Sequence, residues 1–200
     1  LVDSRQELFS LDFKQGFSAM SPTFLHVIAV SYERYGELKG FFQSWLNQTS
    51  TNWCLTVIHD GFSEEFNSIM RSYEGDSMGR IAHFCTEKRY NDYGHSLRDI
   101  GLKGIKGRYV LLTNCDNYFV PKAVEILEDA ESQCNLQAIT PDAIIFDMVH
   151  SHVNPGGRPG GPYSFFDVSY RPLCIDVSAA IIRSEIAKSV GFRDKSHDGD

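Results

Sequence analysis

One stretch of sequence, LLTNCDNYFVP at residues 111–121, limits the possible folds of this chain more than any other. The apolar run that enters it, Tyr109 to Leu112, is of the kind found in a strand buried on both faces of a parallel sheet. A short polar cluster follows, and Pro121 is well placed as the first residue of the helix KAVEILEDA. A strand that leads through polar residues into a helix is the repeating unit of an α/β fold.

The polar cluster contains Asn114, Asp116 and Asn117, just past the carboxyl end of that strand. In open α/β sheets, ligands bind at this edge. A carboxylate there can hold a hard divalent cation, which in turn can bridge the phosphates of a nucleotide. The alternative is that Asp116 and Asn117 only cap a turn, as Asx residues often do.

Strand and helix patterns alternate along the rest of the chain, which predicts a mostly parallel, mixed central sheet flanked by helices on both faces. Two hundred residues suit one domain with its own core. Ser63 is placed to cap the helix that follows it, and residues 154–162 are rich enough in glycine and proline to predict a mobile loop. The predicted strands are 24–30, 53–59, 80–85, 109–112, 143–149 and 179–183, and the predicted helices are 36–48, 64–73, 94–105, 121–130 and 184–190.

Composition excludes several classes of protein. An apolar fraction of 42% and a charged fraction of 22% are typical of a soluble globular chain. A formal charge of −7 without a dense basic cluster argues against a nucleic-acid partner. No run approaches the length of a membrane span, and the first residues lack the apolar core of a signal peptide. The five cysteines are scattered without a CxxC pair, so we expect reduced, buried thiols and a cytoplasmic location.

Three segments match a known family in order and spacing. They are AVSYERY at the end of the first strand, FFQSWLNQTSTNWCLTVIHDGFS, and YGHSLRDIGLKGIKGRYVLLTNCDN. From Phe24 onward the chain resembles the nucleotide-diphospho-sugar glycosyltransferases of the GT-A fold, and among them the large family 2. The spore-coat polysaccharide glycosyltransferases are especially similar, through the Asp-Asn ending of the third segment and a later Ile175-Asp176 pair.

The resemblance implies an enzyme that transfers a sugar from a nucleotide diphosphate to a hydroxyl of a glycan or small acceptor. UDP is the nucleotide that we expect first. Tyr32 would stack on the base and Asp60 would accept a hydrogen bond from the base or the ribose. Asp116 matches the last aspartate of the family's DxD motif, which holds Mn²⁺ or Mg²⁺ against the diphosphate. The donor-site residues implied in this way are Ser31, Tyr32, Asp60, Arg98, Asn114 and Asp116. Tyr32 packed on the next helix and Arg98 as a solvated helix residue are the alternatives.

The chain also departs from the family pattern. His59 stands where the first aspartate of an Asp-Asp pair is usual, and the DxD motif becomes Asn114-Cys115-Asp116. A single carboxylate predicts a weakened metal site, because phosphate oxygens and water must complete the coordination of the ion. His59 on its own is equally compatible with a hydrogen-bonded histidine at the end of a strand.

An inverting transferase needs a general base that deprotonates the acceptor hydroxyl. The resemblance assigns this role to an aspartate in GFRDKSHDGD at residues 191–200, with Asp200 preferred and Asp198 in reserve. Acidic residues near a terminus are otherwise an ordinary solvated tail. Further residues expected to contact the acceptor or the sugar are Asp176, His150 and His152, the two histidines beside a loop that closes over the donor. Two histidines alone lack the third ligand of a metal site.

We therefore expect one GT-A domain over residues 1–200, with a nucleotide-binding half at 1–118 and an acceptor-side half at 119–200. Because the sequence lacks an initial methionine and stops at HDGD, we expect it to be a domain of a longer chain. Two other classes of function compete with this one. A sugar nucleotidyltransferase would carry a glycine-rich basic loop after the first strand, which SYERYGELKG is not. A catalytically silent sugar- or nucleotide-binding module stays open because of His59 and Cys115.

Overall fold

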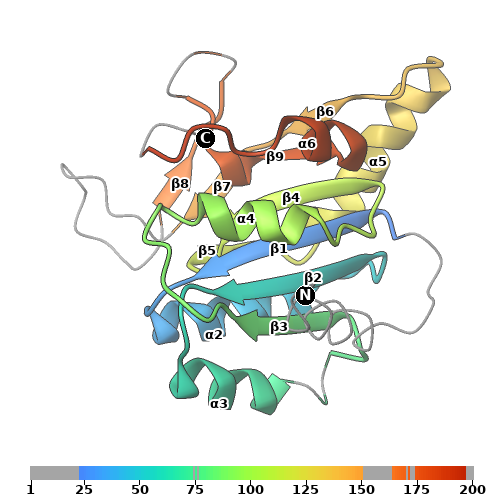
Figure 1. The fold of residues 1–200 in the computed structure, drawn as a ribbon. Helices are drawn as coiled ribbons and strands as arrows, with labels where there is room; N and C mark the ends of the chain where they lie inside the picture. Colours follow the sequence, from blue (N-terminus) through green and yellow to red (C-terminus); the bar gives the residue numbers. More distant parts are fainter. Residues whose placement is uncertain are drawn as a thin grey trace.

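The computed structural model describes residues 23–73, 75, 77–150, 164–169, 171 and 174–196. Its centre is a six-stranded sheet with the strand order β3-β2-β1-β4-β9-β6 (Figure 1). The first four strands in this order are parallel. β9 is antiparallel to both of its neighbours, β4 and β6, so it alone opposes the other five strands, and the predicted mostly parallel, mixed sheet is confirmed. The strands are β1 Leu25–Ser31, β2 Trp53–His59, β3 Ile81–Cys85, β4 Tyr109–Asn114, β6 Ala143–Ile145 and β9 Ala180–Arg183.

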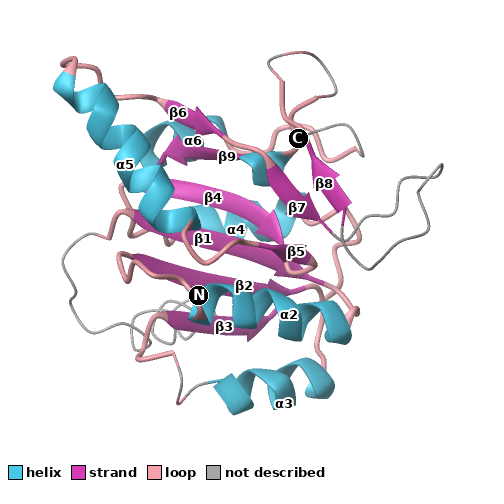
Figure 2. Ribbon diagram, turned by 180° about the vertical axis from the view of Figure 1, so that it is seen from behind, coloured by secondary structure: helices cyan, strands magenta, loops and turns pink. Residues whose placement is uncertain are grey.

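Helices cover both faces of this sheet, as predicted. On one face lie α2 (Tyr35–Leu46), α3 (Glu64–Tyr73) and α5 (Ala123–Leu136); Figure 2 shows α2 and α5 in front of the strands and α3 beside the edge strand β3. On the other face lie α4 (His95–Leu102) and α6 (Ser184–Val190). The side chains of β1 alternate between the two layers, because successive residues of a strand point to opposite faces. Leu25, Val27 and Ala29 belong to the first core, and Ile28 and Val30 to the second.

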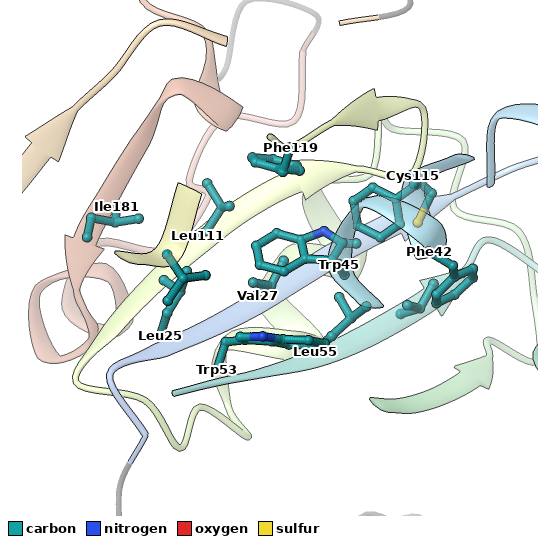
Figure 3. Packing of buried hydrophobic residues seen from close by; sticks show 14 of the residues in the cluster. Leu25, Val27, Phe42, Trp45, Trp53, Leu55, Leu111, Cys115, Phe119 and Ile181 are labelled. Carbon is teal, nitrogen blue, oxygen red and sulfur yellow. The ribbon is translucent and has the colours of Figure 1, made fainter. Parts of the chain in front are cut away.

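The larger core is built around two tryptophans (Figure 3). Trp45 of α2 lies between Trp53 of β2 and Phe119, with ring centroids 5.3 and 4.8 Å away. All three side chains are buried, and each large apolar side chain contributes about 2–3 kcal/mol when it is fully buried. This packing fixes α2 on the sheet, and with it the loop that joins β1 to α2.

Two helix starts show how local sequence sets the geometry at the carboxyl edge of the sheet. The hydroxyl of Ser63 accepts the N–H of Phe66 at 3.1 Å, which confirms the predicted cap of α3. α4 begins after Gly94, whose φ is +86° and where an added Cβ would lie 2.7 Å from Val30 Cγ2. Only glycine combines that backbone angle with so close an approach. The start of α4 is thereby pressed against the end of β1.

Two sequence predictions were wrong in detail. The predicted strand 143–149 is two strands in different sheets: β6 joins the central sheet, whereas β7 (Met148–His150) joins a small antiparallel sheet with β5 (Asn117–Tyr118) and β8 (Ser164–Phe166). The chain changes sheets at Phe146, whose N–H still bonds the carbonyl of Ala179, and at Asp147, whose carboxylate accepts the N–H of Val168.

The second correction concerns the start of α5. Pro121 is not its first residue, because residues 120–123 form a turn in which the N–H of Ala123 bonds the carbonyl of Val120 at 2.9 Å. The carbonyl of Pro121 instead accepts the N–H of Thr49 at 2.8 Å. The five cysteines are free thiols, but only Cys54 and Cys115 are buried as expected, and Cys85, Cys134 and Cys174 are partly exposed. Across the described residues, no helix combines the length and the apolar character needed to cross a membrane.

Candidate functional site

A cleft of about 390 Å³ opens at the carboxyl edge of the central sheet. Ser31 at the end of β1, Asp60 after β2 and Asn114 at the end of β4 all line it, together with Asp116. Strand ends that are far apart in sequence meet here because parallel strands place their carboxyl ends at one edge. The structure therefore brings five of the six predicted donor-site residues into one cleft, with Tyr32 as the fifth.

Asp60 fastens the loop between β3 and α4. Its Oδ1 accepts the N–H of Tyr90 at 2.7 Å, and its Oδ2 accepts the N–H of Asn91 at 3.0 Å. The Nε of Arg89 lies 3.9 Å from Oδ2, and the carboxylate is almost fully buried. A carboxylate with two oxygens and several lone pairs can still accept a further bond from a ligand. In this structure its bonds hold one wall of the cleft.

Tyr32 and Arg89 form a stacked pair on the rim of the cleft. The guanidinium carbon of Arg89 lies 3.6 Å from the centroid of the Tyr32 ring, a cation–π contact, and the tyrosine is 39% exposed. Behind them His59 packs between Tyr35 and Phe66, at centroid distances of 6.1 and 4.9 Å. His59 Nδ1 bonds the carbonyl of Gly61 at 2.8 Å, so its N–H donates there. His59, which stands where the sequence comparison led us to expect an aspartate, is thus a buried aromatic ring that supports the rim of the cleft.

Arg98 lies behind the cleft and does not line it. It is 1% exposed, which contradicts the alternative of a solvated helix residue. Its Nη2 donates to Asn114 Oδ1 at 2.6 Å and its Nη1 to the carbonyl of Tyr93 at 2.9 Å. Arg98 therefore holds the side chain of Asn114 and the loop that ends at Tyr93 in fixed positions.

Asp116 lies at the floor of the cleft, where Arg34 meets it. The Nη1 of Arg34 donates to Asp116 Oδ2 in an ion pair, with the side chains 51% and 9% exposed. The neighbouring Cys115 is buried, and burial raises the pKa of its thiol well above the usual value. A protonated thiol is a weak metal ligand. Within the part of the chain that the structure describes, no three histidine, cysteine, aspartate or glutamate side chains gather as a metal site would require.

Backbone strain is concentrated around this cleft. Glu33 and Arg34 have φ angles of 54° and 50°, and Asn91 and Tyr93 have φ angles of 55° and 58°. All four line the cleft. The left-handed region costs a non-glycine residue about 1–2 kcal/mol, and such residues cluster at functional sites. The loop after β1 and the loop before α4 are therefore held in strained conformations by the residues packed around them.

Asn117 links the polar cluster to the second half of the chain. Its Nδ2 donates to Thr113 Oγ1 and to Ser178 Oγ, both at 3.0 Å. The N–H of Ser178 in turn bonds Asp176 Oδ1 at 2.7 Å, so that Asp176 caps the short 3₁₀ helix η1 (Val177–Ala179). Asp176 is half-buried and is not among the residues that line the cleft.

The C-terminal segment at residues 191–196 packs along α4. Asp99 Oδ1 accepts the N–H of Phe192 at 2.8 Å, and Asp99 Oδ2 pairs with Lys195. The ring of His95 stacks on Phe192 at 5.1 Å and bonds the carbonyl of Ser196 at 2.9 Å. Of the remaining predicted residues, His150 belongs to β7, and His152, Asp198 and Asp200 lie outside the described residues.

Sequence reasoning missed Arg34 and Arg89, the two guanidinium groups of the cleft. Arg34 stands in the loop after β1, and Arg89 in the loop after β3. A signal was available, because loops that follow parallel strands collect at the same edge as Asp60 and Asp116. An arginine in such a loop can face a ligand as well as solvent.

Comparison with known proteins identifies the fold. No protein-family model matches the chain. A curated protein of Rickettsia bellii (strain RML369-C), named as an uncharacterized glycosyltransferase, is 26% identical over 121 residues, which are 60% of this chain and 17% of that protein. The crystal structure of S. aureus TarS 1-349 superposes with a TM-score of 0.63 at 18% identity, covering 88% of this chain and 52% of that one. The chain has the GT-A glycosyltransferase fold.

Other solved structures with this fold hold nucleotides. TarS has been crystallised in complex with UDP and with UDP-GlcNAc. A mannosyltransferase from Pyrobaculum calidifontis, in complex with GDP-Man and Mn²⁺, has a TM-score of 0.58 at 13% identity, covering 93% of this chain and 54% of that one. The predicted resemblance to glycosyltransferases is confirmed for the fold. The GT-A chain described here spans about half the length of these solved structures and less of the Rickettsia protein.

Proposed function

We propose that this chain is the GT-A domain of a glycosyltransferase that takes a sugar from a nucleotide diphosphate, UDP in the first place, and transfers it to a hydroxyl of a glycan or small acceptor. One observation carries the proposal: a polar cleft of about 390 Å³ stands at the carboxyl edge of a GT-A sheet, with Asp60, Asp116 and an aromatic platform at Tyr32. A cleft of this size suits a ligand as large as a nucleotide. The Rickettsia relative and the nucleotide-bound TarS structures support the same class of donor.

The donor is proposed to lie along the cleft with its base near Tyr32 and Arg89 and its diphosphate near Arg34 and Asp116. Stacking on an aromatic ring suits any base, so the choice of UDP rests on polar groups such as Asp60. The Pyrobaculum enzyme, which has a similar fold, has been solved with GDP-Man, so GDP is tested as well. Residues 1–118 would then form the nucleotide-binding half, and residues 119–200 the acceptor side.

Transfer with inversion is the proposed reaction course. The acceptor oxygen attacks the anomeric carbon while the bond from that carbon to the diphosphate oxygen breaks, and a general base takes the acceptor proton. We assign the base to Asp200, with Asp198 as the alternative. The packing of residues 191–196 along α4 supports this assignment, because α4 begins at the cleft wall. Asp176, His150 and His152 are proposed to contact the sugar or the acceptor.

A Mn²⁺ or Mg²⁺ ion at Asp116 stays a prediction. Asp116 offers one carboxylate, which Arg34 already pairs, and the side-chain oxygen of Asn114 accepts a bond from Arg98. These residues do not by themselves form the set of oxygen ligands that such an ion needs. When bound, a divalent ion would neutralise the charge that develops on the leaving diphosphate.

The first test is calorimetric titration of the purified chain with UDP, GDP and dTDP, each with Mn²⁺ and with a chelator. Binding of one nucleotide would establish the donor site and select the nucleotide sugars to screen for transfer. An Asp200→Asn variant should keep donor binding and lose transfer. Equal losses of both would make Asp200 a structural acid, and failure of all three nucleotides to bind would overturn the proposed donor site.

A second candidate is a catalytically silent nucleotide-sugar or glycan-binding module of the same fold. The observation in its favour is that His59 is packed as an aromatic support where the family has an acid. Donor turnover separates the two candidates. A chain that binds a nucleotide sugar without ever releasing the nucleoside diphosphate would be such a module.

A further inference from the structure

We propose that Arg34 neutralises the donor diphosphate in place of a divalent cation, so that the cleft binds a nucleoside diphosphate without a metal. The inference rests on the proposed function and names the residue that carries out one part of it. It makes Arg34 a ligand-binding residue for the phosphates, a role that the DxD-like motif would otherwise give to an ion at Asp116.

The position of the guanidinium is the first argument. The single carboxylate of the motif, Asp116, is paired with Nη1 of Arg34 at the floor of the cleft. A cation bound to Oδ2 of this carboxylate would have to lie where the guanidinium now lies or displace it. A positive charge therefore already stands next to the carboxylate that would anchor a metal.

The neighbouring polar groups are the second argument. Asn114 is the other oxygen donor of the motif, and its Oδ1 accepts a bond from the buried Arg98 at 2.6 Å. Over the described stretches of the chain, no three histidine, cysteine, aspartate or glutamate side chains come together in a way that could hold a metal ion. Arg34 and Arg98 thus each bond a side-chain oxygen of the motif that a metal could otherwise take, Asp116 Oδ2 and Asn114 Oδ1.

The backbone gives a third argument. Arg34 and the preceding Glu33 both lie in the left-handed region, with φ angles of 50° and 54°. Two consecutive non-glycine residues in that region are held there only when their surroundings impose it. The strained loop directs Arg34 toward the cleft floor, where it meets Asp116, and not along the solvated surface of α2.

Charge and exposure complete the argument. The side chain of Arg34 is 51% exposed and carries five N–H donors in a planar fork, of which the pair with Asp116 uses Nη1. Guanidinium groups bind phosphate oxygens through two parallel hydrogen bonds. Arg89 supplies a second guanidinium in the same cleft. Arg89 stacks on Tyr32 at the proposed base end of the cleft, so Arg34 is the guanidinium at the diphosphate end, where a phosphate oxygen would share it with Asp116.

The experiment measures UDP affinity of the wild type and four variants by calorimetry, in excess EDTA and in Mn²⁺. The variants are Arg34→Gln, Arg34→Lys, Asp116→Asn and, as a matched control, Arg71→Gln. Arg71 is 57% exposed and makes one ion pair, with Glu64 on α3, away from the cleft. Thermal unfolding of each variant establishes that it is folded before its affinity is compared.

We expect the wild type to bind UDP equally well in EDTA and in Mn²⁺. Arg34→Gln should weaken binding about 10- to 100-fold, as expected for the loss of a charge-assisted bond to phosphate, and Arg34→Lys should be intermediate because lysine keeps the charge without the fork. Asp116→Asn should bind UDP in EDTA at least as well as the wild type, because it releases Arg34 from its partner. Arg71→Gln should match the wild type.

The opposite pattern overturns the inference and leaves the proposed function standing. In that pattern, EDTA abolishes UDP binding to the wild type, Arg34→Gln still binds UDP in Mn²⁺ as the wild type does, and Asp116→Asn no longer binds it. Failure of the wild type to bind any nucleotide in either condition overturns the proposed function, and the inference with it. The two failures are therefore distinguishable in one set of titrations.

Discussion

Replacing Asp60 by asparagine should destabilise the whole domain, because this carboxylate is a structural clamp as well as a candidate ligand. It accepts two backbone N–H groups, from Tyr90 and Asn91, at 2.7 and 3.0 Å in a nearly buried position. A hydrogen bond to a charged group contributes about 1.5–3 kcal/mol, and a neutral one about 1 kcal/mol. Asparagine keeps one acceptor oxygen and turns its amide toward the other N–H, so we expect a loss of about 3 kcal/mol in the free energy of unfolding.

The assay is urea unfolding followed by circular dichroism, with the slope of free energy against urea compared between variants. A loss of 3 kcal/mol should also lower the melting temperature by roughly 6–12 °C in a domain of this size. Asp147→Asn is the matched control. Asp147 is exposed and accepts a single backbone N–H, from Val168 at 2.9 Å, so its loss should stay within about 0.5 kcal/mol.

One result would refute this reasoning. If Asp60→Asn were as stable as the wild type, or more stable, the two bonds to the loop would contribute nothing, and Asp60 would serve the ligand alone. Residues that serve only binding often lower the stability of the fold, so replacing them commonly leaves the free energy of unfolding unchanged or raises it. The predicted loss is therefore opposite in sign to the expectation for a residue kept only for binding.

Three further predictions concern burial, backbone and the rim of the cleft. Burial lowers the pKa of His26 to about 3, so between pH 7 and pH 5 only the unfolded chain binds a proton at this residue. The free energy of unfolding should therefore fall by about 2 kcal/mol over that interval. In urea unfolding, His26→Gln should show a smaller fall in the free energy of unfolding, and a fall equal to that of the wild type would contradict the role of His26. Gly107→Ala should lower the free energy of unfolding by at least about 2 kcal/mol, since the added Cβ would lie 2.4 Å from the backbone nitrogen of His26 and 2.7 Å from the carbonyl oxygen of Tyr109. A variant as stable as the wild type in the same assay would show that the backbone shifts to make room. Tyr32→Ala should weaken UDP binding about 10-fold in calorimetry while leaving stability nearly unchanged, and an unaltered affinity would remove Tyr32 from the donor site.

The sequence predicted those parts of the fold for which local signals suffice. β2 and α3 begin and end where predicted, because an apolar run bounded by Asp60 and Gly61 and a helix capped by Ser63 are both local signals. The division of residues 143–149 between two sheets could not be predicted. An apolar run indicates that a strand is buried, but the sheet in which the strand pairs depends on contacts with distant residues such as Ala179 and Val168.

The candidate site was predictable to the same extent. Ser31, Asp60 and Asn114 follow apolar strands, and strand ends collect at one edge of a parallel sheet. Arg34 and Arg89 escaped notice because a loop arginine has the same local sequence whether it faces a ligand or solvent. What distinguishes Arg34 is its left-handed backbone and its bond to Asp116, and that bond joins residues more than eighty positions apart in sequence.

β4, the strand that carries the polar motif, is bordered by two strands of very different origin. On one side it pairs with β1, which the ribosome has already produced, and on the other with β9, which is made some seventy residues later. Until β9 arrives, a nascent chain holds the apolar run Tyr109–Leu112 with one row of backbone groups unpaired, a template for wrong pairing. During synthesis, the strand that leads into the candidate site is therefore exposed to wrong pairing until β9 has been made.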